Sequence, residues 1–334
     1  MPRLSHVFFA AAAVSLPLSG AASAAETLTV YTYDSFVSDW GPGPQIEANF
    51  EAVCGCDLEF VSAGDGAALL GRLKLEGKRS RADIVLGLDA NLAADAAATG
   101  LFAPHGLTPE TDVPGGWADP HFLPYDWGWF AFVYDKTRLA TPPASFEELL
   151  AAPDDVTIVI QDPRSSTPGL GLLLWVKQIY GDEAGAVWER LAPRIVTVTK
   201  GWSEAYGMFL QGEAAMALSY TTSPAYHVIA EDDRTKAAAI FSEGHYLQVE
   251  IAGKLASTKQ NALADQFLAF MLSDGFQSAI PETNWMYPAK TPSSGLPEEI
   301  AALPVPAKTL IYPVSDAKAA RDAALTEWLE ALSR

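Results

Sequence analysis

Three polar residues stand where helical patterns begin, and each could place free backbone amides beside a ligand. Asp65, Thr167 and Ser223 are predicted helix N-caps, and Pro168 and Pro224 occupy the first helical position after the last two. Helix N-termini bind phosphate and other anions through these amides. In an open α/β sheet such helix starts meet at the carboxyl ends of the strands. The three caps therefore indicate a polar ligand site, although each could also be a cap alone.

The polar loop at residues 165–167 resembles a phosphate-binding loop in part. It leads into Gly169-Leu170-Gly171, but a nucleotide-binding P-loop requires GxxxxGK[ST] and no Lys follows here. The loop could therefore hold a small phosphate rather than hydrolyse a triphosphate. Its hydroxyls leave open one alternative, an enzyme that acts on phosphate esters.

Aromatic residues at strand ends and in turns indicate a stacking pocket, although each could instead pack locally. These residues are Tyr33, Trp40, Trp202, Tyr220, Tyr226, Trp285 and Tyr287. A desolvated aromatic face attracts an organic cation by roughly 0.5–2 kcal/mol. Asp65, Asp34 or Glu204 could supply the countercharge. The pattern therefore suggests a flat cationic ligand.

Signatures of catalysis and of metal binding are weak. The chain has no GxSxG or HExxH motif, and its histidines are scattered. We expect no catalytic residue, no resident metal and no cofactor. Tyr226 beside His227, together with Tyr220, leaves a ferric-iron or other small-solute binding protein as the alternative. Iron-binding proteins of this size usually pair adjacent tyrosines, whereas Ala225 precedes Tyr226 here.

Cys54 and Cys56 are the two cysteines of the chain and are separated by one glycine. An oxidising compartment permits a disulfide, but so small a ring strains its geometry. A strained bridge and two thiols in a turn both remain open. Catalytic dithiols usually have a spacing of two residues, so redox catalysis is disfavoured.

Composition and the first residues indicate a secreted protein of roughly two domains. The chain has 334 residues, of which 49 % are apolar, and its net charge of −19 disfavours a nucleic-acid partner. Arg3, the apolar run at 7–18 and the small residues at 22–24 predict a signal peptide over residues 1–24. We therefore expect cleavage and a periplasmic location, with no membrane-spanning segment.

Strand-like and helix-like stretches alternate along the chain and predict an α/β fold with largely parallel sheets. The predicted strands are residues 28–34, 58–62, 84–88, 130–134, 157–160, 195–198 and 216–220. We expect two sheets joined by crossing segments, with a ligand cleft between them.

The ordered motifs of the chain resemble those of the periplasmic thiamine-binding proteins, the substrate-binding subunits of bacterial thiamine ABC importers. The matching segments are LTVYTYDSF (28–36), DWGPGP (39–44), ADIVLGLD (82–89), QDPRSSTPGLGLLLW (161–175), TVTKGWSEAYG (197–207), LSYTTSPAYH (218–227), FSEGHYLQVE (241–250) and NWMYP (284–288). They span most of the chain between residues 28 and 288, whereas residues 289–334 match less clearly.

The resemblance implies a type II periplasmic-binding-protein fold with two α/β lobes and a ligand cleft at the hinge. We expect residues 25–124 and 247–288 to form lobe 1 and residues 125–246 to form lobe 2, and helices in 289–334 to pack on either lobe, with lobe 2 preferred. The implied ligands are thiamine and its mono- and diphosphate. The implied partners are a membrane permease and its cytoplasmic ATPase, and the chain itself is expected to be a monomer.

The resemblance also implies a set of ligand contacts. Carried over position by position, these are Asp65, Gly66, Ser166, Thr167, Trp202, Tyr220, Thr221, Thr222, Ser223, Tyr226 and Trp285. Tyr33, Asp34 and Trp40 are further candidates. Trp127 and Trp129 stand where the family pattern would have tyrosines, so their contribution to the site is an open question.

Overall fold

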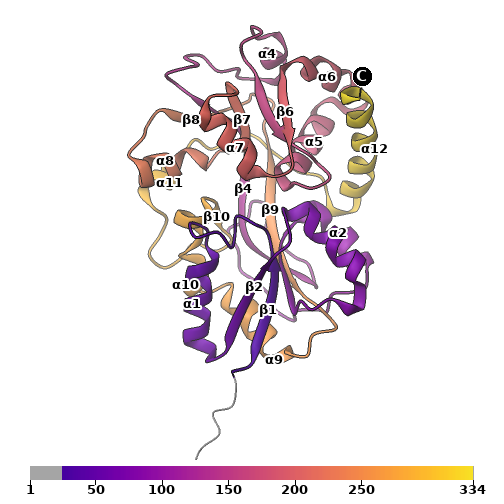
Figure 1. Ribbon diagram of the computed structural model, residues 1–334, viewed down its shortest axis with the longest axis vertical. Coiled ribbons are helices and arrows are strands. Elements are labelled where there is room, and N and C mark those ends of the chain that lie inside the picture. Colours follow the sequence, from indigo (N-terminus) through magenta and orange to yellow (C-terminus); the bar gives the residue numbers. More distant parts are fainter. Residues whose placement is uncertain (1–24, 334) are drawn as a thin grey trace, which may run out of the picture.

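The computed structural model describes residues 25–333, and two long strands run through both halves of the molecule (Figure 1). These are β4 (Phe122–Asp135) and β9 (His245–Lys254), which pair antiparallel. The other main strands are β1 (Thr27–Thr32), β2 (Asp57–Ser62), β3 (Ile84–Asp89), β5 (Ile158–Gln161), β6 (Ile195–Thr199), β7 (Met216–Tyr220) and β8 (Lys236–Ala239). Their order along the sheet is β2-β1-β3-β9-β4-β7-β5-β6, with β8 paired to β4.

The pairing of the strands divides the molecule into two halves. In the lower half of Figure 1, β1 pairs parallel with β2 and β3, and β3 joins β9. In the upper half, β5 pairs parallel with β6 and β7, and β7 joins the second part of β4. The prediction of an α/β fold is confirmed, but the pairs made by β4 and β9 with their neighbouring strands β3, β7 and β8 are antiparallel. The predicted lobe boundaries stay a prediction, because strand pairing does not define rigid bodies.

Helices cover the faces of both halves. Their bounds are α1 (Gly43–Cys54), α2 (Gly66–Glu76), α3 (Ala93–Ala98), α4 (Phe146–Ala151), α5 (Thr167–Tyr180), α6 (Ala184–Leu191), α7 (Trp202–Gln211), α8 (Ser223–Glu231), α9 (Asn261–Phe270), α10 (Asp274–Gln277), α11 (Glu298–Ala301) and α12 (Val314–Leu332). The last helix packs against α5 and α6 in the upper half (Figure 1). It also reaches the lower half, where Arg321 pairs with Asp95 of α3 at 2.7 Å.

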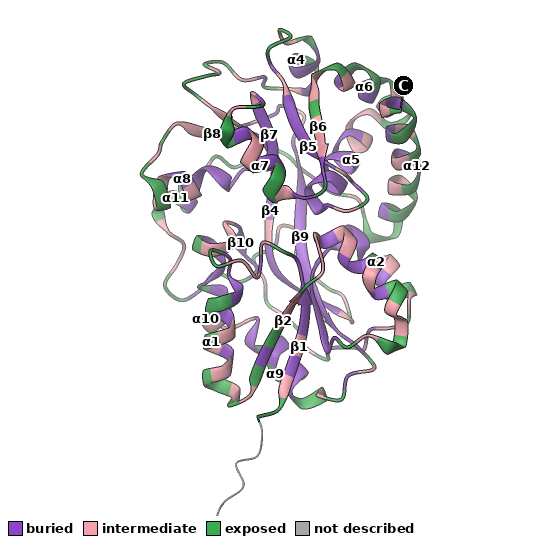
Figure 2. Ribbon diagram, viewed as in Figure 1, coloured by how far each residue is buried: buried purple, intermediate pink, exposed green. Residues whose placement is uncertain are grey.

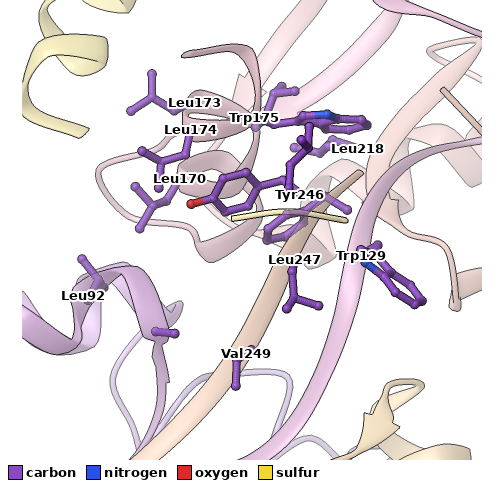
Figure 3. Close-up of a cluster of buried hydrophobic side chains, with 14 of the residues drawn as sticks. Leu92, Trp129, Leu170, Leu173, Leu174, Trp175, Leu218, Tyr246, Leu247 and Val249 are labelled. Atoms are coloured by element: carbon purple, nitrogen blue, oxygen red, sulfur yellow. The ribbon is translucent and has the colours of Figure 1, made fainter. Parts of the chain in front are cut away.

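The crossing strands are buried along most of their length and carry the core between the halves (Figure 2). Burial of apolar side chains is the main favourable contribution to folding, about 25 cal/mol per Å². Figure 3 shows part of the largest cluster, in which Tyr246 and Leu247 of β9 lie near Leu170, Leu174 and Trp175 of α5. A second cluster, which includes Phe36 and Phe267, fills the lower half. Both halves therefore pack against the same two strands, β4 and β9.

Some predictions of helix caps and strands agree with the structure, and others do not. Asp65 caps α2 as predicted, because its carboxylate accepts from the amide of Gly66 at 2.6 Å. The caps predicted at Thr167 and Ser223 are wrong by one residue, since both lie in the first helical turn after Ser166 and Thr222. Helix boundaries commonly vary by this amount. Strands β8 and β9 and the first half of β4 were not predicted.

Cys54 and Cys56 form a disulfide at the end of α1, which decides between the two states that the sequence leaves open. The described helices include none long and apolar enough to cross a membrane. The predicted signal peptide at residues 1–24 lies outside the described residues.

Candidate functional site

A cavity of about 570 Å³ lies between the two halves, and residues of the crossing strand β9 are part of its lining. Tyr33, Trp40 and Asp65 line it from the lower half, and Trp202 and Tyr226 line it from the upper half. Its volume falls in the range of small-molecule sites, and such sites commonly lie at domain interfaces. The arrangement can therefore enclose a ligand between two parts of the fold.

Seven aromatic residues are among those that line the cavity. Trp202 stacks on Tyr206 with ring centroids 5.0 Å apart, and Trp40 approaches Trp202 from the other half at 6.2 Å. On another wall, Trp285 meets the edge of Tyr226 at 5.2 Å. Fixed rings of this kind favour a flat ligand, and their faces favour a positive one.

Trp285 adopts an unusual backbone conformation. Its φ of 57° lies in the left-handed region, directly after the π-helix η5 (Ile280–Asn284). That conformation is costly for a bulky residue, and it recurs at functional sites as well as at helix C-termini. The surrounding structure therefore holds the indole at the cavity by backbone geometry as well as by packing.

Asp65 connects three helix N-termini across the cavity. Its carboxylate accepts from Gly66 of its own helix, from the Ser166 hydroxyl at 2.7 Å, and from the amides of Trp202 at 3.3 Å and Thr167 at 3.5 Å. Burial raises the pKa of Asp65, whereas these hydrogen bonds act to lower it. Because α5 and α7 belong to the other half, Asp65 holds the two halves together in this closed arrangement.

The second carboxyl of the cavity is Glu250 of β9. Its Oε2 accepts from the hydroxyls of Tyr33 and Tyr125, each at 2.8 Å. Burial is the main cause that raises the pKa of Glu250, to about 7. Among the described residues, no Lys or Arg lines the cavity. The cavity therefore has an electrostatic preference for positive charge.

Small hydroxyl residues from the helix starts border the cavity. Ser223 bonds to Ser219, which in turn accepts from the indole nitrogen of Trp202 at 2.8 Å. The Thr167 hydroxyl is buried and has no hydrogen-bond partner in the part of the chain that is described. A buried unpaired hydroxyl is costly, so a ligand that bonds to it would gain.

Most of the residues singled out from the sequence meet at this cavity. Those that line it are Tyr33, Trp40, Asp65, Thr167, Trp202, Tyr220, Ser223, Tyr226 and Trp285. Gly66, Ser166, Thr221 and Thr222 are buried behind this lining. Asp34 and Glu204 lie at a smaller adjoining hollow. No ligand contact is observed directly, so the contact set stays a prediction.

Three of the aromatic residues considered lie elsewhere. Tyr287 stacks on Trp127 at 4.6 Å, and Trp129 meets both rings. The Trp129 indole donates to Thr309 at 3.0 Å. These rings therefore pack with each other beside β4, outside the lining of the cavity.

Sequence reasoning missed several residues of the lining, above all Glu250, Gln248 and Asn284. A signal existed in the sequence. Gln248 and Glu250 alternate with Leu247, Val249 and Ile251, which is the pattern of a strand with one polar face. In a strand buried on both faces, such polar residues need partners or a ligand.

One group of side chains with metal-binding chemistry lies on α8 and in the turn after it. In the described part of the chain, one group of three suitable side chains occurs: His227, Glu231 and Asp233. The ring nitrogens of His227 are engaged by Tyr206 at 2.8 Å and Glu231 at 2.7 Å. Asp233 pairs with Lys236 at 3.0 Å. These hydrogen bonds account for the cluster without an ion.

Comparison with known proteins also indicates a protein that binds a small solute. Residues 37–278 match the family of bacterial extracellular solute-binding proteins. The chain is 54% identical over 336 residues to the thiamine-binding periplasmic protein of Brucella suis biovar 1 (strain 1330), with 100% of both chains covered. A solved periplasmic thiamin binding protein superposes with a TM-score of 0.91 at 53% identity, covering 96% of this chain and 100% of that one.

The likeness to iron-binding proteins is more distant. Iron-bound HitA from Pseudomonas aeruginosa gives a TM-score of 0.75 at 21% identity, covering 92% of this chain and 99% of that one. Identity at this level shows a shared fold and nothing about a shared ligand.

Proposed function

The chain belongs to the family of bacterial extracellular solute-binding proteins, and we propose that it captures thiamine between its two halves for uptake by an ABC importer. Its fold is that of the periplasmic binding proteins, and its family consists of binding proteins rather than enzymes. Likeness over the full chain to thiamine-binding periplasmic proteins supports thiamine as the ligand. The support for iron binding is a distant likeness of fold.

The observation that carries the proposal is an aromatic cavity with two carboxyl groups and, within the described residues, no basic lining residue. Thiamine has a permanently charged thiazolium and a flat aminopyrimidine. Flat cationic groups gain from aromatic faces and from nearby negative charge. Each part of the ligand thus has a counterpart in the cavity.

Thiamine mono- and diphosphate are proposed as further ligands. Thr167 and Ser223 lie in the first turns of α5 and α8 and border the cavity. Helix starts with hydroxyl side chains bind phosphate oxygens. A phosphorylated tail would therefore lie toward these helix starts, and an unphosphorylated hydroxyl would bond to the same groups.

Location and partners complete the proposal. The relatives are periplasmic proteins, and a cleaved signal at residues 1–24 would direct this chain to the same compartment. The closed chain, as a monomer, would dock on a membrane permease that works with a cytoplasmic ATPase. Closure around a ligand by hinge motion is a general device of such binding proteins.

Isothermal titration calorimetry with thiamine, its two phosphates and a ferric salt tests the proposal. We expect saturable binding of thiamine at one site per chain and no visible absorption band on addition of ferric ion. Incubation with thiamine monophosphate should release no inorganic phosphate. Absence of thiamine binding by folded protein would refute the proposal, and phosphate release would favour the enzyme alternative.

A further inference from the structure

We propose that Glu250 is the countercharge of the bound cation and thereby selects charged ligands over neutral ones of the same shape. This inference rests on the proposed function and identifies the group that recognises the thiazolium. Glu250 lies in the middle of a strand that crosses between the halves, and its side chain lines the cavity. It is 5 % exposed, so solvent screens its charge little.

Glu250 is one of three acids in a row across adjacent strands. Its register partner on β4 is Asp126, and its register partner on β3 is Asp89. Directly opposed residues of an antiparallel pair have Cβ atoms about 5 Å apart. Asp126 and Asp89 are 0 % and 1 % exposed. Of these pairs, Glu250 and Asp126 act on each other electrostatically, and two such buried carboxylates are not both charged without a cation.

The protonated form is favoured at Asp126, the register partner of Glu250 on β4. Burial and the charge of Glu250 raise the pKa of Asp126 well above its ordinary value. Its Oδ2 accepts from the Asn284 amide at 2.6 Å, while its buried Oδ1 has no hydrogen-bond partner among the described residues. Burial likewise raises the pKa of Asp89, to about 7. Glu250 is the member of the row that lines the cavity, so its carboxyl is the one that a ligand meets.

The charge of Glu250 is available to a ligand, whereas that of Asp65 is largely offset. Asp65 accepts from the N-termini of three helices, each of which carries partial positive charge. Glu250 accepts from two neutral tyrosine hydroxyls. The groups that face Glu250 are Tyr33 after β1, Asp89 of β3, Tyr125 and Asp126 of β4, Tyr220 of β7, Asn284 of η5 and, at longer range, Asp65. None of these groups is a cation.

Gln248 supplies an independent sign that a ligand belongs at this wall. It lies two residues before Glu250 and also lines the cavity. It is 1 % exposed, and its Oε1 has no hydrogen-bond partner in the described chain. An unpaired buried acceptor is costly unless a ligand donor bonds to it. The aminopyrimidine of thiamine carries such a donor.

The test compares thiamine with 3-deazathiamine, a neutral analogue in which carbon replaces the charged thiazolium nitrogen. Calorimetry is done on the wild type, Glu250→Gln and the neighbouring isosteric control Asp126→Asn. Glu282→Gln removes an exposed acid near the cavity and controls for net charge. The Glu250→Gln substitution should weaken thiamine at least about 30-fold, the scale on which losing one partner of a buried charge pair weakens a complex. It should weaken the analogue less than about 3-fold.

Each outcome either supports or overturns the role proposed for Glu250. Binding of the analogue by Glu250→Gln shows that the variant is folded, and retained selectivity in Asp126→Asn supports the proton on Asp126. Equal losses for both ligands in Glu250→Gln, or loss of selectivity in Asp126→Asn alone, would overturn the assignment. If the wild type bound neither ligand, the proposed function itself would fail, which is a different result.

Discussion

Replacement of Asp65 by Asn removes the charge that holds the two halves together and leaves the side-chain shape intact. In the closed chain, Asp65 accepts from Ser166 at 2.7 Å and, over longer distances, from the amides of Thr167 and Trp202. All three donors lie in the other half. One short hydrogen bond to a charged group contributes about 1.5–3 kcal/mol, and the two long ones add little.

The loss should therefore be about 2 kcal/mol for the closed state relative to an open one. If thiamine binds the closed state and the free chain is mainly open, the whole of this cost appears as weaker binding, about 30-fold. The loss should be the same for thiamine and for its neutral analogue, because Asp65 acts through closure. This behaviour differs from that expected of Glu250→Gln.

Calorimetry with both ligands measures this effect, and small-angle scattering of the ligand-free chain reports the fraction that is closed. Asp57→Asn is the matched control, since Asp57 is exposed and accepts from the Thr27 hydroxyl within its own half. It should change binding less than about 3-fold. A change that small in Asp65→Asn, or a loss confined to the cationic ligand, would refute the closure role.

Three further predictions follow from individual contacts. Trp202→Ala or Tyr226→Ala should weaken thiamine by about 1–3 kcal/mol through lost stacking and burial, and unchanged calorimetric affinity in both would contradict the cavity assignment. Gly66→Ala places a Cβ against Thr167 of the other half and the carbonyl of Gly87, so thiamine should bind more weakly while the far-ultraviolet circular dichroism stays the same. Burial raises the pKa of Glu250 and of Asp89 to about 7 from ordinary values of 4.5 and 3.8, so the folded chain keeps protons that the unfolded chain loses. The free energy of unfolding of the ligand-free chain, measured with urea, should therefore fall as pH rises from about 4 to about 7. The fall should be smaller in Glu250→Gln. A rise over that range in the wild type would refute the raised pKa of these two groups.

The sequence predicted the parts of the fold whose patterns are local. Strands such as β5 and β7 are short apolar runs between turns, and Asp65 stands directly before an amphipathic helix, so both were found. Strand β9 was missed because Gln248, Glu250 and Lys254 interrupt its apolar pattern. Partners on β3 and β4 accommodate those polar groups. These partners are distant in the sequence, so no local pattern reveals them.

The candidate site was predictable by residue type but not by role. Tyr33, Trp202 and Trp285 were singled out as aromatic residues in turns, and the structure brings them to one cavity. Asp65 was expected to offer its charge to the ligand, whereas the structure engages that charge with helix amides from both halves. Which carboxyl is free to meet a cation depends on long-range pairing, and the sequence alone does not contain that information.

The central claim is that the cavity between the halves encloses thiamine, and a crystal structure of the chain with thiamine tests it most directly. We predict the aminopyrimidine among Trp202, Tyr226 and Trp285 and the thiazolium nearest the Glu250 carboxylate. Thiamine bound outside this cavity, or bound within it with the thiazolium directed away from Glu250 toward solvent, would contradict the account.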